Sequence, residues 1–176
     1  MRVFDTERLK LRLMTEDDVD NLQQIFSDPV AMQYYPSTKN LEETISWIRW
    51  TLNNYESHGV GLWVVERKDD EEFLGQCGIV PQNVNHSMEY EIGYLFVRQF
   101  WGNGYATEAA VACRDWGFDN LNPARLISLI DPRNKPSQGV AIRNGMSLHE
   151  HIVRRDKPVD VWAIARSEWN SQKSSY

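Results

Sequence analysis

The alternation of hydrophobic and polar residues predicts seven strands. The first, Arg-Leu-Lys-Leu-Arg-Leu-Met from residue 8, alternates strictly, which is typical of a strand with one buried face. Three later strands follow one another through short polar turns, which indicates an antiparallel meander. The fifth strand is mostly apolar and should run parallel to the fourth. The predicted strands are residues 8–14, 62–66, 73–80, 89–97, 124–130, 149–154 and 159–165.

Apolar residues that recur every three or four positions predict about four helices. The first begins after the cap residue Thr15 and stops before Asp28-Pro29. The second covers about residues 41–56, the third follows the glycine turn and runs to about residue 120, and the fourth covers residues 136–143 and is ended by Asn144-Gly145. We therefore predict one α+β domain over residues 1–176, built on a mixed sheet of seven strands.

Composition narrows the classes of function. The 41% hydrophobic content and seven tryptophans favour a folded globule. The formal net charge of −6 argues against general nucleic-acid binding, which depends on neutralising phosphates, but leaves an anionic small ligand possible. No apolar run approaches the roughly 18 residues of a membrane span, and the N-terminus does not resemble a signal peptide. We therefore expect a cytoplasmic protein that binds neither nucleic acid nor membrane.

The cysteines and histidines give no sign of a metal site. Cys77 and Cys113 lie in apolar patterns and predict buried, reduced thiols. His149 and His151 lie two apart on a predicted strand without a third ligand, so a solvated strand face is favoured over zinc. We expect no metal.

The segment that says most about function is Gln-Phe-Trp-Gly-Asn-Gly-Tyr-Ala-Thr-Glu-Ala, residues 99–109, which lies between a predicted strand and a predicted helix. Gly102 and Gly104 allow a tight turn and close approach of a ligand to the backbone. The unpaired N–H groups and positive dipole end of the following helix point back at this turn. The segment therefore predicts a site for phosphate or pyrophosphate.

Three kinds of phosphate-bearing ligand are candidates for this turn. Gly-x-Gly is half of a dinucleotide fingerprint, but Thr107 stands where the third glycine belongs. The Gly-Lys-Ser/Thr of nucleotide hydrolases is absent from the turn. Coenzyme A is the third possibility and the one we favour.

Here the sequence resembles the GNAT superfamily of N-acetyltransferases. Its signature Gln/Arg-x-x-Gly-x-Gly/Ala is present from Gln99 to Gly104. The resemblance extends to Thr-Glu-Arg-Leu-x-Leu-Arg from residue 6, Glu-Ile-Gly-Tyr from residue 91, Asn-x-x-Ser from residue 134 and Asn-Gly-Met from residue 144. The extended pattern looks most like the subgroup of ribosomal-protein N-terminal acetyltransferases. It departs at Met146, where the family usually has Phe or Tyr.

The resemblance implies that acetyl-CoA is the co-substrate. Main-chain N–H groups of the turn would hold the pyrophosphate, and pantetheine would pair with the end of the fourth strand. The thioester would lie in a V-shaped split between the fourth and fifth strands. The implied cofactor-binding residues are Phe96, Val97, Gln99, Gly102, Asn103, Gly104, Tyr105, Ala106, Thr107, Asn134 and Ser137.

The implied reaction is direct attack of a primary amine on the acetyl carbonyl within a ternary complex. An amine with a pKa of about 10 needs a base, for which Glu91 is the first candidate and Glu89 the second. Both could instead simply face solvent. A backbone N–H near Val97 is the expected oxyanion donor. Many family members have a proton-donating Tyr where this chain has Ala141, so Ser137 is the substitute candidate; alternatively, Ser137 caps its helix.

The acceptor groove of the family is built by the first two helices and their connecting loop. Met32, Tyr34, Tyr35 and Trp47 are its candidates here, with core packing as the alternative. The acceptor is expected to be a peptide N-terminus or a small amine, and the acidic chain mildly favours a cationic one. The protein would be a monomer or homodimer. A non-catalytic acyl-CoA-binding module with the same fold is the alternative function.

Overall fold

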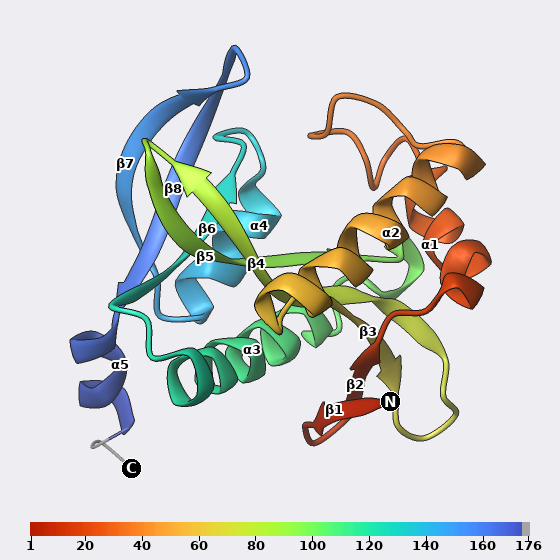
Figure 1. The fold of residues 1–176 in the computed structure, drawn as a ribbon, viewed down its shortest axis with the longest axis horizontal. Coiled ribbons are helices and arrows are strands. Elements are labelled where there is room, and N and C mark those ends of the chain that lie inside the picture. The colour runs from red at the N-terminus through yellow and green to blue at the C-terminus, as the bar shows by residue number, and fades with distance from the viewer. Residues whose placement is uncertain (174–176) are drawn as a thin grey trace.

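The computed structural model describes residues 1–173 and contains a single sheet of eight strands (Figure 1). Their spatial order is β1-β2-β3-β4-β5-β6-β8-β7. The strands are β1 Arg2–Asp5, β2 Leu9–Leu13, β3 Leu62–Arg67, β4 Phe73–Val84, β5 Ser87–Phe96, β6 Arg125–Ile130, β7 Ser147–Arg154 and β8 Lys157–Ala165.

One strand pair differs from all the others. Neighbouring strands run antiparallel except β5 and β6, which are parallel and pair only where Glu91 lies opposite Ile127. Beyond that point the two strands diverge toward their carboxyl ends. This confirms the predicted V-shaped split, since β5 and β6 are the fourth and fifth predicted strands.

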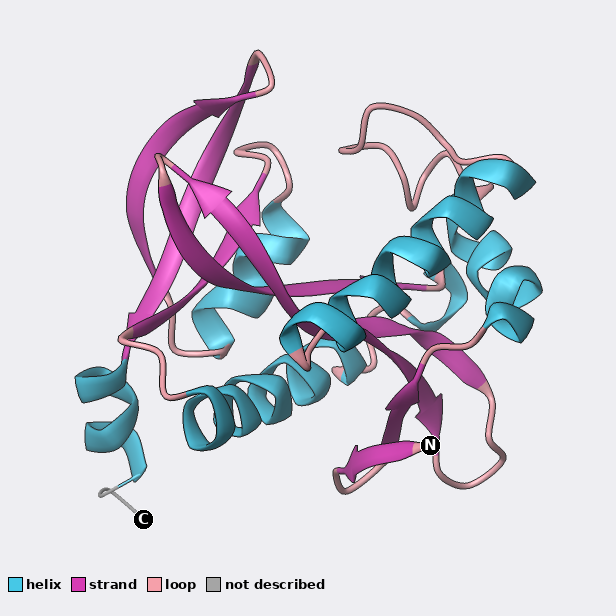
Figure 2. Cartoon of the chain, viewed as in Figure 1, coloured by secondary structure: helices cyan, strands magenta, loops and turns pink. Residues whose placement is uncertain are grey.

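Helices cover both faces of the sheet (Figure 2). They are α1 Val19–Phe26, α2 Leu41–His58, α3 Tyr105–Leu121, α4 Lys135–Arg143 and α5 Arg166–Lys173, with 3₁₀ turns at Glu16–Asp18 and Arg98–Phe100. Strand β3 shows how the faces divide, because successive side chains of a strand point to opposite sides. Trp63 and Val65 pack with α3, whereas Leu62 and Val64 pack with α1 and α2.

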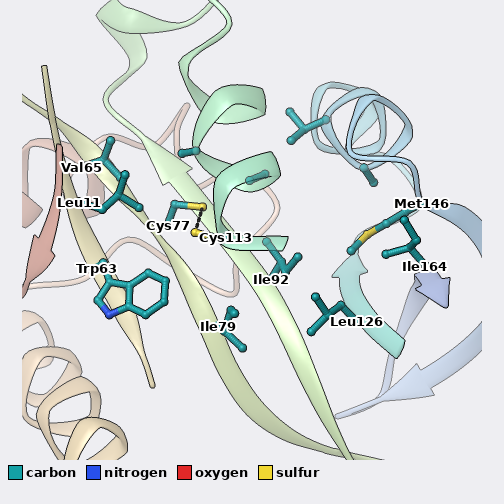
Figure 3. Close-up of a cluster of buried hydrophobic side chains, with 14 of the residues drawn as sticks. Leu11, Trp63, Val65, Cys77, Ile79, Ile92, Cys113, Leu126, Met146 and Ile164 are labelled. Carbon is teal, nitrogen blue, oxygen red and sulfur yellow. Dashed lines mark hydrogen bonds between the residues drawn. The ribbon is translucent and has the colours of Figure 1, made fainter. Parts of the chain in front are cut away.

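The cluster between the sheet and α3 contains both cysteines (Figure 3). Cys77 of β4 and Cys113 of α3 are fully buried, and their sulfur atoms lie 3.5 Å apart as free thiols. The prediction of buried, reduced cysteines is confirmed. Across residues 1–173 no helix has the length and apolar character to cross a membrane.

The α+β class with a mixed sheet is confirmed, but the element counts were too low. The sheet has eight strands instead of seven because β1, only four residues long, gains its structure by pairing with β2. The described part of the chain has five α-helices instead of four because α5 forms in the segment expected to be a polar tail. Its one buried residue, Trp169, stacks on Phe118 of α3 with ring centres 4.8 Å apart.

Candidate functional site

The glycine turn has the conformation that its sequence predicts. Gly102 and Gly104 adopt the left-handed region with φ of 79° and 78°, and Gly104 is the N-cap of α3. The Asn103 side chain donates to the carbonyls of Phe100 and Trp101 at 2.9 and 3.2 Å. The 17-residue helix α3 therefore begins directly after a turn that the Asn103 side chain stabilises.

Residues of the amino-terminal segment stabilise this turn through hydrogen bonds. Glu108, in the first turn of α3, accepts hydrogen bonds from Thr6 Oγ1 at 2.5 Å, the Arg8 backbone N–H at 2.8 Å and Arg8 Nε at 2.6 Å. Arg8 also donates to the Asn103 carbonyl at 2.9 Å and stacks over the Tyr105 ring. Burial tends to raise the pKa of Glu108, but these hydrogen bonds outweigh it and lower the pKa.

A cavity of about 660 Å³ opens directly in front of the turn. Its lining comes from α4, from the loop that joins α1 to α2 and from the diverging end of β5. Two cations line it, Lys135 and Arg143, and Arg143 Nε donates to Thr107 Oγ1 at 3.0 Å. A helix N-terminus with flanking cations suits an anionic ligand.

The predicted cofactor residues divide into two groups. Eight of them line this cavity, namely Phe96, Gly102, Gly104, Tyr105, Ala106, Thr107, Asn134 and Ser137. Three do not line it: Val97, Gln99 and Asn103. Val97 is buried in the cluster beneath α1 and α2, Gln99 is exposed, and the Asn103 side chain is used within the turn.

The expected oxyanion donor was a backbone N–H near Val97, and the structure excludes that of Val97 itself. The N–H of Val97 donates to the Leu74 carbonyl at 2.9 Å, so it is not available to a ligand. Because hydrogen bonding alternates along an antiparallel strand, the N–H groups of Tyr94 and Phe96 point away from β4, toward the split. The Ile92 carbonyl follows the same alternation, since it accepts Ser128 Oγ of β6 at 2.8 Å.

A second cavity of about 240 Å³ adjoins the first at the split. Glu91 lines it and accepts a hydrogen bond from Gln82 Nε2 at 2.9 Å and another from the Leu129 backbone N–H. Burial raises the pKa of Glu91, and these hydrogen bonds together with the charge of Arg154 only partly oppose it. A carboxyl with a raised pKa beside a cleft suits proton transfer.

Glu89, the second candidate base, lies outside both cavities. Its carboxylate is bound by Arg125 of β6, with Arg125 Nη2 2.5 Å from Glu89 Oε1. The structure therefore brings Glu91 to the split but not Glu89.

Ser137 and Asn134 lie at the start of α4, and both line both cavities. Asn134 is the N-cap, because its side-chain oxygen accepts the Ser137 N–H at 3.2 Å. The cap is therefore Asn134 and not Ser137. Ala141, where the family's Tyr would stand, is fully buried in the core.

Tyr94 was not among the predicted site residues, yet it lines both cavities. Its hydroxyl donates to the Ser137 carbonyl at 2.7 Å, and burial raises its pKa. Its alternation with Ile92 and Phe96 indicated only an apolar strand face. Arg154 and Lys157 were also missed, because they reach the second cavity from strands far along the chain.

The four predicted acceptor residues divide evenly. Tyr34 and Tyr35 line both cavities. Tyr35 exposes 41% of its surface, but burial of its hydroxyl, reinforced by the nearby Glu91, raises its pKa to about 12. Met32 is buried in the core, and the Trp47 indole donates to Gln76 at 3.1 Å away from both cavities.

Neither histidine of the predicted strand face is part of a metal cluster. His151 Nδ1 lies 2.5 Å from Asp160 Oδ1. Within residues 1–173 no group of three or more histidine, cysteine, aspartate or glutamate side chains has an arrangement that could hold a metal ion.

Comparison with known proteins places the chain in a family. A family model described as an acetyltransferase (GNAT) domain matches residues 8–147. YkkB, an uncharacterized protein of Bacillus subtilis (strain 168), is 44% identical over 158 residues, which cover 89% of this chain and 92% of YkkB. The crystal structure of an acetyltransferase from Agrobacterium tumefaciens str. C58 is 31% identical, with a TM-score of 0.82 over 93% of this chain and 94% of that one.

Similarity of fold extends further than similarity of sequence. The ribosomal L7/L12 alpha-N-protein acetyltransferase RimL, solved in complex with coenzyme A, is 18% identical, with a TM-score of 0.77 over 94% of this chain and 98% of RimL. At that identity only the fold is shared. The family match covers most of the chain, and the chain therefore belongs to the GNAT family of acetyltransferases and is an N-acetyltransferase.

Proposed function

We propose that this protein binds acetyl-CoA in the 660 Å³ cavity and transfers the acetyl group to a primary amine held in the adjoining cavity. One observation carries the proposal. The glycine turn that caps α3 opens on a cavity that ends at the split between β5 and β6, and there Glu91 lines a second cavity.

The turn fits the pyrophosphate of coenzyme A. No protein atom lies within 4 Å of the position that a Cβ at Gly102 would occupy, so the space beside this backbone is open. The first N–H groups of α3 lack partners within the helix and can donate to phosphate oxygens. Arg143 and Lys135 add positive charge, and the outward-facing N–H groups of Tyr94 and Phe96 suit the amide-bearing pantetheine arm.

Glu91 is the proposed base. The amine nitrogen forms a bond to the acetyl carbon as the bond from that carbon to sulfur breaks. Glu91 takes the proton that the amine loses, and the departing thiolate takes up a proton to give free coenzyme A. The outward-facing N–H groups of Tyr94 and Phe96 replace that of Val97 as the proposed donors to the carbonyl oxygen.

The proton for the thiolate has two candidate sources. Ser137 lines both cavities at the N-terminus of α4, and the Tyr94 hydroxyl lies beside it. Ala141 offers no donor, so the proton must come from a different place than in relatives with Tyr at this position.

The test is release of coenzyme A from acetyl-CoA by the purified protein with a panel of small amines and peptides, combined with calorimetric titration of acetyl-CoA. We expect saturable binding and release of coenzyme A that depends on the acceptor. Binding without turnover for every acceptor would favour the non-catalytic acyl-CoA-binding module. Absence of binding would overturn the proposal altogether.

A further inference from the structure

The second cavity contains a pair of cations that the proposed reaction does not use. Arg154 at the end of β7 and Lys157 at the start of β8 line it together with Glu91. Neither makes an ion pair with a carboxylate in residues 1–173. Arg154 is partly buried and Lys157 is exposed. Cations that line a cleft without an ion pair attract an anionic group of a ligand.

The side-chain amide of Gln82 bridges Arg154 and Glu91 in this cavity. Gln82 Oε1 accepts from Arg154 Nη2 at 2.9 Å, while Gln82 Nε2 donates to Glu91 at 2.9 Å. The amide thus holds the guanidinium and the carboxyl at a fixed short separation on one wall. An acceptor in the cavity therefore meets a proton-accepting group and a positive charge a short distance apart.

The acidic groups nearby only partly offset these cations: Lys157 helps to lower the pKa of Asp131, and Arg154 acts on Glu91, without an ion pair in either case. Asp131 also lines the cavity, but Arg133 binds it with two hydrogen bonds of 3.0 and 2.7 Å. Glu91 is kept from direct contact with Arg154 by the Gln82 amide. Arg154 is partly buried, so its attraction for an anion is screened less than that of a fully exposed cation.

We propose that the acceptor is a primary amine that also carries a carboxylate, with the amine at Glu91 and the carboxylate at Arg154 and Lys157. Guanidinium groups bind carboxylates through paired, charge-assisted hydrogen bonds. A polyamine would instead place a second positive charge beside two cations. The local lining therefore reverses the mild preference for a cationic acceptor that the net charge suggested.

This inference rests on the proposed function, and matched acceptors separate the two. We would compare 4-aminobutyrate with butylamine, which differ in the carboxylate but have similar amines, and add spermidine as a polycation. A dipeptide with an acidic side chain and its amide counterpart distinguish a peptide source of the carboxylate from a free amino acid. We expect kcat/KM to be at least about tenfold higher for the acidic member of a pair.

Lys157→Gln is the sharpest variant because Lys157 is outside the Gln82 linkage that orients Glu91. We expect kcat/KM for acidic acceptors to fall about tenfold or more relative to kcat/KM for butylamine, because the variant removes only a contact to the carboxylate. Arg155→Gln is the matched control: it removes one positive charge from the same hairpin, from an exposed residue that lines neither cavity.

These experiments distinguish a failure of the proposed acetyl transfer from a failure of the carboxylate inference. No turnover with any acceptor overturns the proposed function. Turnover that is equal or faster without the carboxylate, or an effect of Lys157→Gln no larger than that of Arg155→Gln, overturns the carboxylate inference and leaves acetyl transfer standing.

Discussion

Gly102 combines a left-handed backbone conformation with open space on the side where a Cβ would lie. Its φ of 79° disfavours any residue with a Cβ, and the open space beside it is where we place the pyrophosphate. We expect Gly102→Ala to raise the KM for acetyl-CoA at least about tenfold and to lower the free energy of unfolding by about 1 kcal/mol. Steady-state kinetics and urea denaturation measure the two effects.

Gly59 provides the control for that experiment. It caps α2 with a φ of 70° and also has no protein atom within 4 Å of a would-be Cβ, but it lies outside both cavities. Gly59→Ala should therefore cost similar stability and leave the KM for acetyl-CoA unchanged. Equal effects of both variants on that KM would show that the Gly102 result reflects strain alone.

The raised pKa of Glu91 leads to a prediction for the pH dependence of the reaction. Only the carboxylate can accept a proton, so activity is lost as the pH falls through the pKa of Glu91. Burial raises that pKa, so kcat/KM should show an inflection above the ordinary value of about 4.3. The inflection belongs to the enzyme if it stays in place for two acceptors with different amine pKa values, and the assignment fails if it moves with the amine.

At the scale of elements, Glu108 connects α3 to the segment before β2. Three donors from Thr6 and Arg8 converge on its carboxylate, and the Glu108 side chain is 19% exposed. We expect Glu108→Gln to lower the free energy of unfolding by about 1–2 kcal/mol at pH 7 and to weaken acetyl-CoA binding, because the turn loses its brace. Chemical denaturation and calorimetry measure both.

The pH dependence of that variant has a defined sign. The pKa of Glu108 is lowered in the folded state, so its stabilisation is complete above the unfolded value of about 4.3 and disappears as the pH falls through the folded value. The difference between Glu108→Gln and the parent should vanish there. Glu42→Gln, which removes a charge from the first turn of α2, should cost only about 0.3–1 kcal/mol; a larger loss would mean that helix-end charge and not the brace dominates.

The elements that the sequence predicted correctly are those whose signal is local. Strict alternation in β2 and β5 and the two glycines before α3 depend on neighbours within a few residues. Strand β1 and helix α5 were missed because partners distant in sequence stabilise them, β2 in one case and Phe118 in the other.

At the scale of the whole molecule, the site also divides into residues that a local motif predicts and residues that only the folded sheet brings together. The turn and its cavity-lining residues follow from a local motif. The occupied N–H of Val97 depends on pairing with β4, and the places of Tyr94, Arg154 and Lys157 depend on strands that meet only in the folded sheet. Pattern alone also left Trp47 and Met32 undecided between groove and core. The structure places Met32 in the core cluster under α1 and α2, and Trp47 is partly buried and packs against that cluster.

The central claim is that this fold brings acetyl-CoA at the α3 turn to an amine at Glu91. The most direct test is a single-turnover measurement of acetyl transfer by wild type and Glu91→Gln, with both proteins saturated with acetyl-CoA. We predict equal acetyl-CoA affinity and a transfer rate lower by about 10²–10⁴-fold in the variant, since it retains the turn but cannot accept the proton. Transfer at the wild-type rate by Glu91→Gln, or no transfer by wild type, would contradict the account.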